Sequence, residues 1–250
     1  MFGVEYQNNT RIKQTFQNFA NPVDDFMLRD AVVRVGVYAQ DEWRITDTLS
    51  ATVGLRYDHN DWIGSRLSPR GALIWQATPK STFKALYGRA HRSPNSYERN
   101  YNDGVSQVAN PGLHSEAVDT AELVADYLPY PTLNLRATMY AWDMYNLIAL
   151  GTDPISGLSQ YQQQSGKVRA RGGELSLDKT WDWGARFRAS FGVQDIQQKN
   201  SQLLNAPYYL GKVNFSIPIP LISGLRAGFE LQYYGRRKTL DGSYADSYVL

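Results

Sequence analysis

The sequence contains no cysteine and only three histidines among its 250 residues. Without cysteine the chain can form neither a disulfide scaffold nor a thiolate metal site. It also has no uninterrupted run of about 18 apolar residues, which excludes a transmembrane helix. A charge excess is missing as well, because 26 basic residues are balanced by 24 acidic ones and the net charge is +2. Such a balance predicts no nucleic-acid partner.

Long segments of alternating hydropathy are what the sequence does contain. In residues 185–194 every second residue is apolar, and the residues between them are polar or very small. The same pattern returns in residues 225–234. Such segments exceed the usual five or six residues of a soluble strand and match the roughly 9–11 residues with which a tilted strand crosses a bilayer. We therefore expect the apolar face to meet lipid and the polar face to line a lumen.

Alternation recurs along the chain and predicts a series of strands. They are expected at residues 2–10, 31–45, 49–60, 67–77, 82–90, 116–128, 133–147, 165–180, 185–196, 207–217 and 224–237, with another beginning near residue 247. The connections alternate between long and short, and the longest are expected at residues 11–30, 91–115 and 148–164. Transmembrane barrels have short periplasmic turns and long extracellular loops. The predicted fold class is therefore all-β, an antiparallel up-and-down transmembrane β-barrel segment of about 11–12 long strands.

The main alternative is a soluble β-sandwich or solenoid in which the apolar face is a core. The mean hydropathy of −0.46 does not decide between them, because only alternate residues of a barrel strand must be apolar. Aromatic residues make up 13% of the chain, with 17 Tyr and 6 Trp, and this content suits interfacial girdles. The loop pattern favours the membrane barrel, since a sandwich has no reason to place its long loops at one end.

Both ends of the sequence are abrupt. Residues 1–6 start inside an alternating segment, without the basic and apolar regions of a signal peptide. Because an outer-membrane protein must be exported, we expect the natural N-terminus to lie upstream of Met1. Residues 247–250 look like the start of a strand.

Several motifs follow one another in a recognisable order. They are Gly36–Trp43, Leu55–Asp58, Leu67–Arg70, Tyr87–Glu98, Asn110–Leu113 and Lys167–Leu175. In this order and spacing the chain resembles the C-terminal part of the β-barrel of TonB-dependent outer-membrane receptors. That family has a barrel of about 22 strands with a plugged lumen. The resemblance implies that residues 1–250 form one partial barrel domain, without the plug, the TonB box and the final strands.

The resemblance also implies a function in the outer membrane of a Gram-negative cell. The expected activity is that of a receptor and transporter for a metal chelate, such as a ferric siderophore, with cobalamin and haem as alternatives. The implied partners are outer-membrane lipid, the receptor's own N-terminal plug, the energy transducer TonB and the chelate itself, with no cofactor and no enzymatic activity. Because the plug and final strands are absent, the chain alone is not expected to form a working transporter.

A complete small outer-membrane barrel is the other hypothesis, either a porin of about 12 strands or a barrel enzyme. An enzyme of this kind needs a nucleophile with a histidine in hydrogen-bond reach. Asp58–His59 is the only adjacent acid–histidine pair, and neighbours on a strand point to opposite faces. Catalysis is therefore disfavoured.

Candidate ligand-binding residues lie in the loop expected after residue 90. Aromatic rings and arginines suit an aromatic, anionic metal chelate through stacking and charge. The candidates are His91, Arg92, Tyr97, Arg99, Tyr101 and His114. Ordinary loop packing is the alternative for each, and no metal site is predicted, because isolated histidines lack metal-ligand spacing. Tyr161 and residues 160–164 offer weaker candidates for polar contacts.

The polar face of the predicted strands carries charges of both signs. They are Arg56, Arg70, Lys84, Arg136, Arg186, Arg188, Lys212, Arg226 and Arg236, with Asp58, Glu122, Asp126, Glu174 and Glu230. One interpretation is a lumen wall that holds the plug or favours anions. The simpler interpretation is a solvated wall whose charges pair across strands.

Overall fold

The computed structural model describes residues 1–17, 19, 26–199, 201–222 and 224–250. Its main feature is one antiparallel sheet in which strands pair in the order β1-β2-β3-β4-β5-β6-β7-β10-β11-β13-β14-β17, with β12 attached to β11. The long strands are β1 (Phe2–Phe16), β2 (Phe26–Arg44), β3 (Leu49–Asn60), β4 (Gly64–Thr78), β5 (Ser81–Arg92), β6 (Glu116–Tyr130), β7 (Leu133–Tyr145), β10 (Val168–Thr180), β11 (Arg186–Gln198), β13 (Tyr209–Pro218) and β14 (Arg226–Tyr234).

The remaining elements are short. They are α1 (Ser96–Asn100), β8 (Ile148–Thr152), β9 (Ser159–Gln163), β12 (Ser201–Gln202), β15 (Arg237–Lys238), β16 (Tyr244–Ala245) and β17 (Tyr248–Val249). None of the helices in the described part of the chain is long and apolar enough to cross a membrane.

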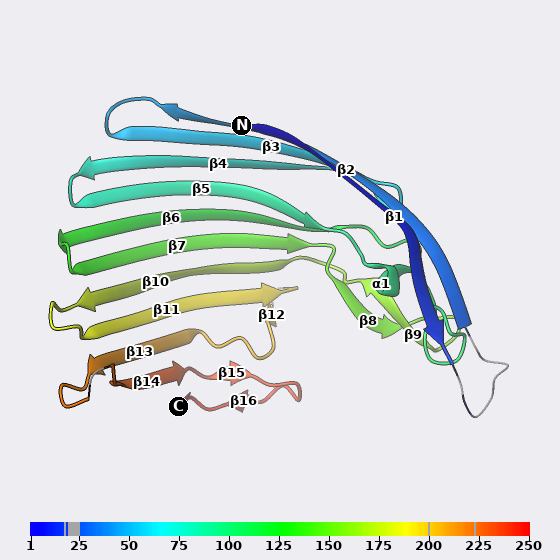
Figure 1. Ribbon diagram of the computed structural model, residues 1–250. Coiled ribbons are helices and arrows are strands. Elements are labelled where there is room, and N and C mark those ends of the chain that lie inside the picture. The colour runs from blue at the N-terminus through cyan, green and yellow to red at the C-terminus, as the bar shows by residue number, and fades with distance from the viewer. Residues whose placement is uncertain (18, 20–25, 200, 223) are drawn as a thin grey trace.

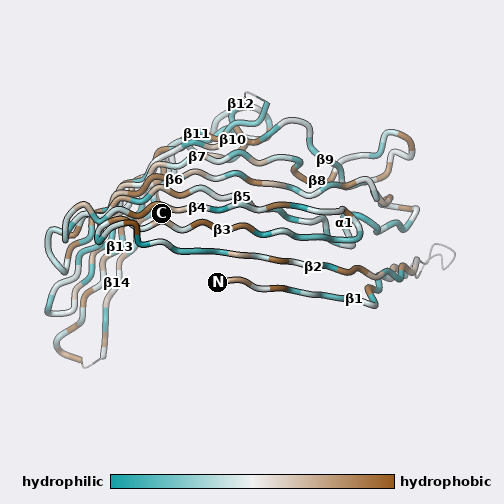
Figure 2. Tube along the Cα trace, turned by 90° about the horizontal axis from the view of Figure 1, so that it is seen from above, coloured by the Kyte–Doolittle hydropathy of each residue, from teal (hydrophilic) through white to brown (hydrophobic). Residues whose placement is uncertain are grey.

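The sheet forms an open arch. In Figure 1 the strands lie side by side, with the short turns at the left end and α1, β8 and β9 toward the right end. Seen from above in Figure 2, the strands follow an arc from β1 to β14. The order of pairing has β1 at one end and β17 at the other, so the sheet is not closed. The predicted all-β, up-and-down barrel segment is confirmed.

The apolar face of the arch points away from any shared interior. Leu123, Met139 and Leu175 on this face are 58, 67 and 65% exposed, and Phe229 is 58% exposed. A soluble sandwich would bury such residues against a second sheet. Within the described residues, the buried hydrophobic side chains are few: Val32, Leu113, Val168, Ala170 and Ala185. The expectation that the apolar face is the outer one is therefore confirmed.

Glycines on the inner face allow long side chains to lie flat against it. A Cβ on Gly36 would stand 2.4 Å from Arg56 Nη2, and one on Gly54 would stand 2.8 Å from Arg70 Nε. The arginines therefore occupy the space that a larger residue would fill. This explains why the polar face alternates with very small residues in the sequence.

The predicted loop at residues 11–30 is wrong in part. β1 continues to Phe16 and β2 begins at Phe26, and the two pair down to Phe16↔Phe26. β3 reaches only as far as the pair Arg34↔Asn60. The rest of the hairpin has no third strand, and its covered face includes the polar Gln14 and Asp30, so hydropathy alternates only weakly there. Residues 18 and 20–25 of the predicted loop lie outside the described part of the chain.

The other strands were predicted to within a few residues at each end. β3 was predicted with its observed bounds, and β6 and β7 with their observed starts. The two later loops contain elements that the alternation did not indicate. The loop after β5 contains α1, and the loop after β7 contains the β8–β9 hairpin.

Candidate functional site

The helix α1 is fixed at its start by a capping box. The Asn95 side chain accepts a hydrogen bond from Glu98 N, and the Glu98 carboxylate accepts one from Asn95 N. This reciprocal pair satisfies two backbone donors that would otherwise lack partners. A helix of five residues needs such a cap, because its intrinsic stability is low.

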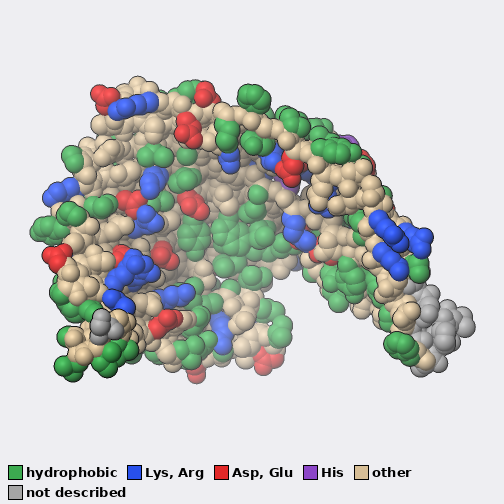
Figure 3. Space-filling view, in the orientation of Figure 1, with side chains coloured by type: hydrophobic (Ala, Val, Ile, Leu, Met, Phe, Trp, Pro, Cys, Tyr) green, Lys and Arg blue, Asp and Glu red, His purple; other side chains and the backbone are tan. Residues whose placement is uncertain are grey.

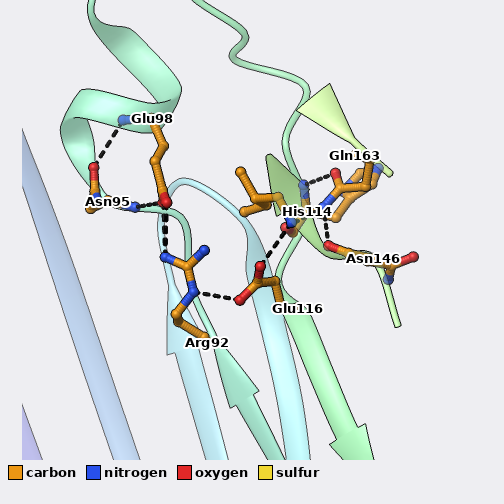
Figure 4. A network of polar contacts seen from close by, with 8 residues as sticks. Arg92, Asn95, Glu98, His114, Glu116, Asn146 and Gln163 are labelled. Atoms are coloured by element: carbon orange, nitrogen blue, oxygen red, sulfur yellow. Dashed lines mark hydrogen bonds and ion pairs between the residues drawn. The ribbon is translucent and has the colours of Figure 1, made fainter. Parts of the chain in front are cut away.

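Arg92 ties this helix to the first residue of β6. Its guanidinium lies 2.9 Å from Glu98 Oε2 and also contacts the Glu116 carboxylate. The same Glu116 accepts a hydrogen bond from Ile148 N at the start of β8. Figure 4 shows Arg92 between the two carboxylates, with Asn95 on one side. The structure therefore places the predicted ligand residue Arg92 within internal ion pairs.

The other side of α1 contacts the first strands of the sheet. Gln14 Nε2 donates to Ser96 Oγ at 2.7 Å, and Asn100 Nδ2 donates to Asp30 Oδ2. Arg99 lies over the Trp62 ring, with its Cζ atom 5.5 Å from the ring centroid. The helix thus joins the β1–β2 hairpin to the loop after β3. Arg99 keeps one planar face against an aromatic ring.

Three tyrosines gather where α1 meets the β8–β9 hairpin. The ring centroids of Tyr97 and Tyr101 are 4.6 Å apart, and those of Tyr97 and Tyr161 are 6.0 Å apart. Tyr97 remains 46% exposed. Burial, followed by the charge of the Asp103 carboxylate, raises the pKa of Tyr101. The structure therefore brings two predicted site residues together and adds Tyr161, so that a partly exposed aromatic cluster lies at the long-loop end.

Asp103 organises the chain that follows the tyrosines. Its carboxylate accepts hydrogen bonds from Val105 N, Ser106 N and Gln107 N, and from the Ser106 hydroxyl. Burial opposes its ionisation, but these donors outweigh burial and hold the pKa of Asp103 well below its usual range. Asp103 is thus a charged centre around which this loop is wrapped.

Glutamines connect the two long loops. Gln163 accepts a hydrogen bond from His114 N and donates to His114 O, and it also donates to Asn146 O. Gln160 donates to Ala109 O. The His114 side chain is exposed, while its backbone is held by this contact, as Figure 4 shows. The glutamines that were predicted as weak ligand contacts therefore join loop to loop.

The histidines lie at the long-loop end of the sheet, as expected. His91 Nδ1 is 3.1 Å from Ser68 Oγ, where the pairing of β4 with β5 has ended at Arg70↔Gly88. No contact joins His91 to His114 in the described part of the chain. Among the described residues there is also no group of three His, Asp or Glu side chains placed to hold a metal ion.

Two adjoining cavities hollow the inner face of β1–β5 below the loops. Their volumes are about 650 and 500 Å³, and they share Glu5, Arg56, Asp58, Ser68 and His91. Arg56 donates to both carboxylates, at 2.9 Å to Glu5 Oε2. Figure 3 shows the concave side of the arch, with charged side chains on its wall and hydrophobic ones on the floor of the hollow.

Several of the charges on the inner wall have partners across the strands. Asp126 lies 2.9 Å from Lys84 Nζ and 2.6 Å from Arg136 Nε. Asp178 pairs with Arg186 and Arg188 in the same way. The simpler interpretation of the polar face, in which charges pair across strands, describes these residues.

Some residues that build the site were not predicted from the sequence, among them Asn95, Glu98, Asp103 and Glu116. For two of them the sequence contained a signal, because Asn95 and Glu98 have the spacing of a capping box.

Long strands, an exposed apolar face, a concave polar face and ordered loops at one end define a segment of an outer-membrane type of β-barrel. The family profile described as TonB dependent receptor-like, beta-barrel matches residues 1–250. The chain belongs to this family, and the predicted resemblance is confirmed.

Two curated relatives show which members of this family the chain is similar to. The chain is 32% identical over 188 residues to the vitamin B12 transporter BtuB of Vibrio cholerae, which covers 75% of this chain and 29% of that protein. It is 29% identical over 137 residues to the ferric enterobactin receptor of Pseudomonas aeruginosa, which covers 49% of this chain and 18% of that protein. The chain thus spans less than a third of the length of these relatives.

Solved structures show the same fold. The ferric enterobactin receptor of Pseudomonas aeruginosa in complex with enterobactin matches with a TM-score of 0.73 at 21% identity, over 88% of this chain and 37% of that one. The siderophore receptor PirA from Acinetobacter baumannii matches with a TM-score of 0.71 at 19% identity, over 88% of this chain and 39% of that one. The two curated relatives are named as a receptor and a transporter, which fits the prediction that the chain is not an enzyme.

Proposed function

We propose that this chain is the C-terminal part of the barrel, without its final strands, of an outer-membrane receptor that takes up a metal chelate. A ferric siderophore is the first candidate, cobalamin is the second, and haem is a weaker third. Uptake would be energised through TonB, and a plug would occupy the concave face of the arch. The named activities of the siderophore receptors and of the B12 transporter support the chelate class.

The observation that carries this proposal is the aromatic cluster of Tyr97, Tyr101 and Tyr161 at the long-loop end. A flat, aromatic and anionic chelate would stack on the exposed ring of Tyr97. Arg99, which lies against Trp62 on the other side of α1, would supply positive charge to the same loop. The exposed His114 side chain adds a further polar group at this end.

His91 and Arg92 have a different role in this proposal. Arg92 holds α1 against β6 through its two carboxylates, so it would position Tyr97 without contacting the chelate. His91 would contact a ligand only below the loops, where it lines the two cavities of the inner wall. The site would therefore have an outer level of tyrosines and an inner level at the lumen wall.

The test is equilibrium binding of ferric enterobactin and of cyanocobalamin to the full-length receptor. Replacing Tyr97 and Tyr101 together with Ala should weaken binding of the true substrate by about tenfold, which corresponds to roughly 1.4 kcal/mol. Tyr130→Ala, a tyrosine beside a short turn, is the matched control and should leave the affinity unchanged. Unaltered affinity in the double variant would remove the tyrosine cluster from the site.

A further inference from the structure

The outer face of the arch contains an apolar groove near the short turns. It has a volume of about 740 Å³ and crosses β6, β7, β10, β11, β13 and β14. The inner-wall cavities lie on the opposite face of other strands, β1–β5. This groove is therefore separate from the proposed chelate site.

Small residues in neighbouring register positions form the depression. Ala125 is opposite Ala137, and Phe191 is opposite Gly211. On the next row toward the short turns, Ala189 is opposite Leu177. Leu175 and Phe191 rise beside these small residues and are 65 and 48% exposed. The groove exists because small residues lie beside large ones in the same rows of one sheet face.

A lysine stands at the turn end of the groove on the same face. Lys179 is opposite Phe187 in the next row, two residues beyond Leu177 toward the turn. Its Nζ atom donates to Thr132 Oγ1 at 2.7 Å and lies 5.7 Å from the centroid of the Trp181 ring. The apolar groove thus ends at a fixed cation beside an interfacial tryptophan.

We propose that this groove binds one phospholipid of the periplasmic leaflet, with an acyl chain in the groove and the phosphate at Lys179. Short turns are the periplasmic ends of such barrels, which places Lys179 at headgroup depth. Inside a bilayer the hydrophobic effect does not favour one apolar surface over another. Preference for this site therefore comes from dispersion contacts with the walls of the groove and from the charge at its end.

The proposed lipid site requires only that the outer face lies in a bilayer. It does not require that the loops bind a chelate, so either proposal can be refuted without the other. The test uses the full-length receptor in mild detergent, titrated with phosphatidylethanolamine and observed by native mass spectrometry. One lipid should remain bound at low lipid concentration. Ala137→Phe, which fills the groove, should weaken retention of this lipid by about tenfold. Ala51→Phe, on the outer face of β3 and outside the groove, should retain it.

The lysine is tested with the same lipid and with diacylglycerol, which has no phosphate. Lys179→Gln should weaken retention of phosphatidylethanolamine and leave retention of diacylglycerol unchanged. Equal lipid retention by the parent protein, Ala137→Phe and Ala51→Phe would show annular lipid only and would overturn the proposal. The midpoint of urea unfolding of Ala137→Phe, measured in parallel, shows whether the variant is folded.

Discussion

Asp126 and Leu123 lie on the same strand, three residues apart, and have opposite environments. Asp126 faces inward, is 7% exposed and has Lys84 and Arg136 within 3 Å. Leu123 faces outward, is 58% exposed and has Met139 opposite it on β7. The inner face is stabilised by particular partners, while the outer face needs only an apolar medium. A substitution should therefore have very different effects on the two faces.

An arginine tests this comparison most strongly. Met139→Arg puts a charge on the outer face near the middle of β7 and should cost about 2–4 kcal/mol of stability in a bilayer. Thr138→Arg, at the adjacent inward position, should cost much less, because the lumen is hydrated. Urea unfolding of the full-length receptor refolded in lipid vesicles measures both. Equal costs would show that the outer face is not in lipid.

Substitution of a closely packed glycine on the inner face should have the next largest effect on stability. A Cβ on Gly172 would stand 2.6 Å from the backbone carbonyl of Val193, which cannot move aside as a side chain can. Gly172→Ala should therefore destabilise the barrel by about 1–3 kcal/mol. Gly192→Ala would make only ordinary contacts, the nearest at 3.7 Å, and should change the urea midpoint little. An unchanged urea midpoint for Gly172→Ala would contradict the close approach of these strands.

Substitutions in the ion-pair network of Arg92 and Glu116 should change the stability of the long loops and not that of the whole barrel. Glu116→Ala removes the partner of Arg92 and the acceptor of Ile148 N, which should lower the free energy of local opening by about 1 kcal/mol. Hydrogen exchange at Ile148 measures this change. Asp47→Asn is the matched control, because the Arg44–Asp47 pair is 74 and 97% exposed at its side chains and such pairs contribute little. Similar exchange in both variants would show that the ion pairs of Arg92, Glu98 and Glu116 add no stability.

A change of pH should have the smallest effect. The pKa of Asp103 is lowered in the folded loop, so its stabilisation is complete above the ordinary carboxyl pKa of about 4. It decreases only as the pH falls from there through the depressed pKa. Hydrogen exchange at Val105 and Gln107, corrected for intrinsic rates, should show equal protection at pH 7 and pH 5. Asp103→Asn should lose protection at both, and loss in the parent protein by pH 5 would contradict the prediction.

The sequence predicted the strands wherever one face differs from the other. β3 was predicted with its observed bounds because Leu55 and Arg56 face different surroundings. The hairpin beyond Asn9 was missed because the face that is partly covered there includes polar residues, such as Gln14 and Asp30, which bond to α1. Hydropathy reports burial only where the covered side of a strand is apolar.

The candidate site was predicted by residue type and not by arrangement. Tyr97 and Tyr101 are only four residues apart, so their proximity could be expected from a helical turn. The approach of Tyr161, from a separate hairpin, depends on backbone pairing between the two loops. Arg92 was predicted as a ligand contact from its residue type, because its partner Glu116 lies 24 residues away in the sequence and the ion pair could not be foreseen. Contacts of this kind are set by tertiary structure, which residue type alone does not report.

The position of α1 has a kinetic consequence. The helix contacts the first hairpin through Gln14 and Asp30, and it contacts β6 through Arg92. Because either set of contacts alone still holds the helix, its amides should exchange only when both sets break together, in one concerted event and not by gradual fraying. A segment held at two separate points opens less often than one held at a single point, so the waiting time between openings should be long.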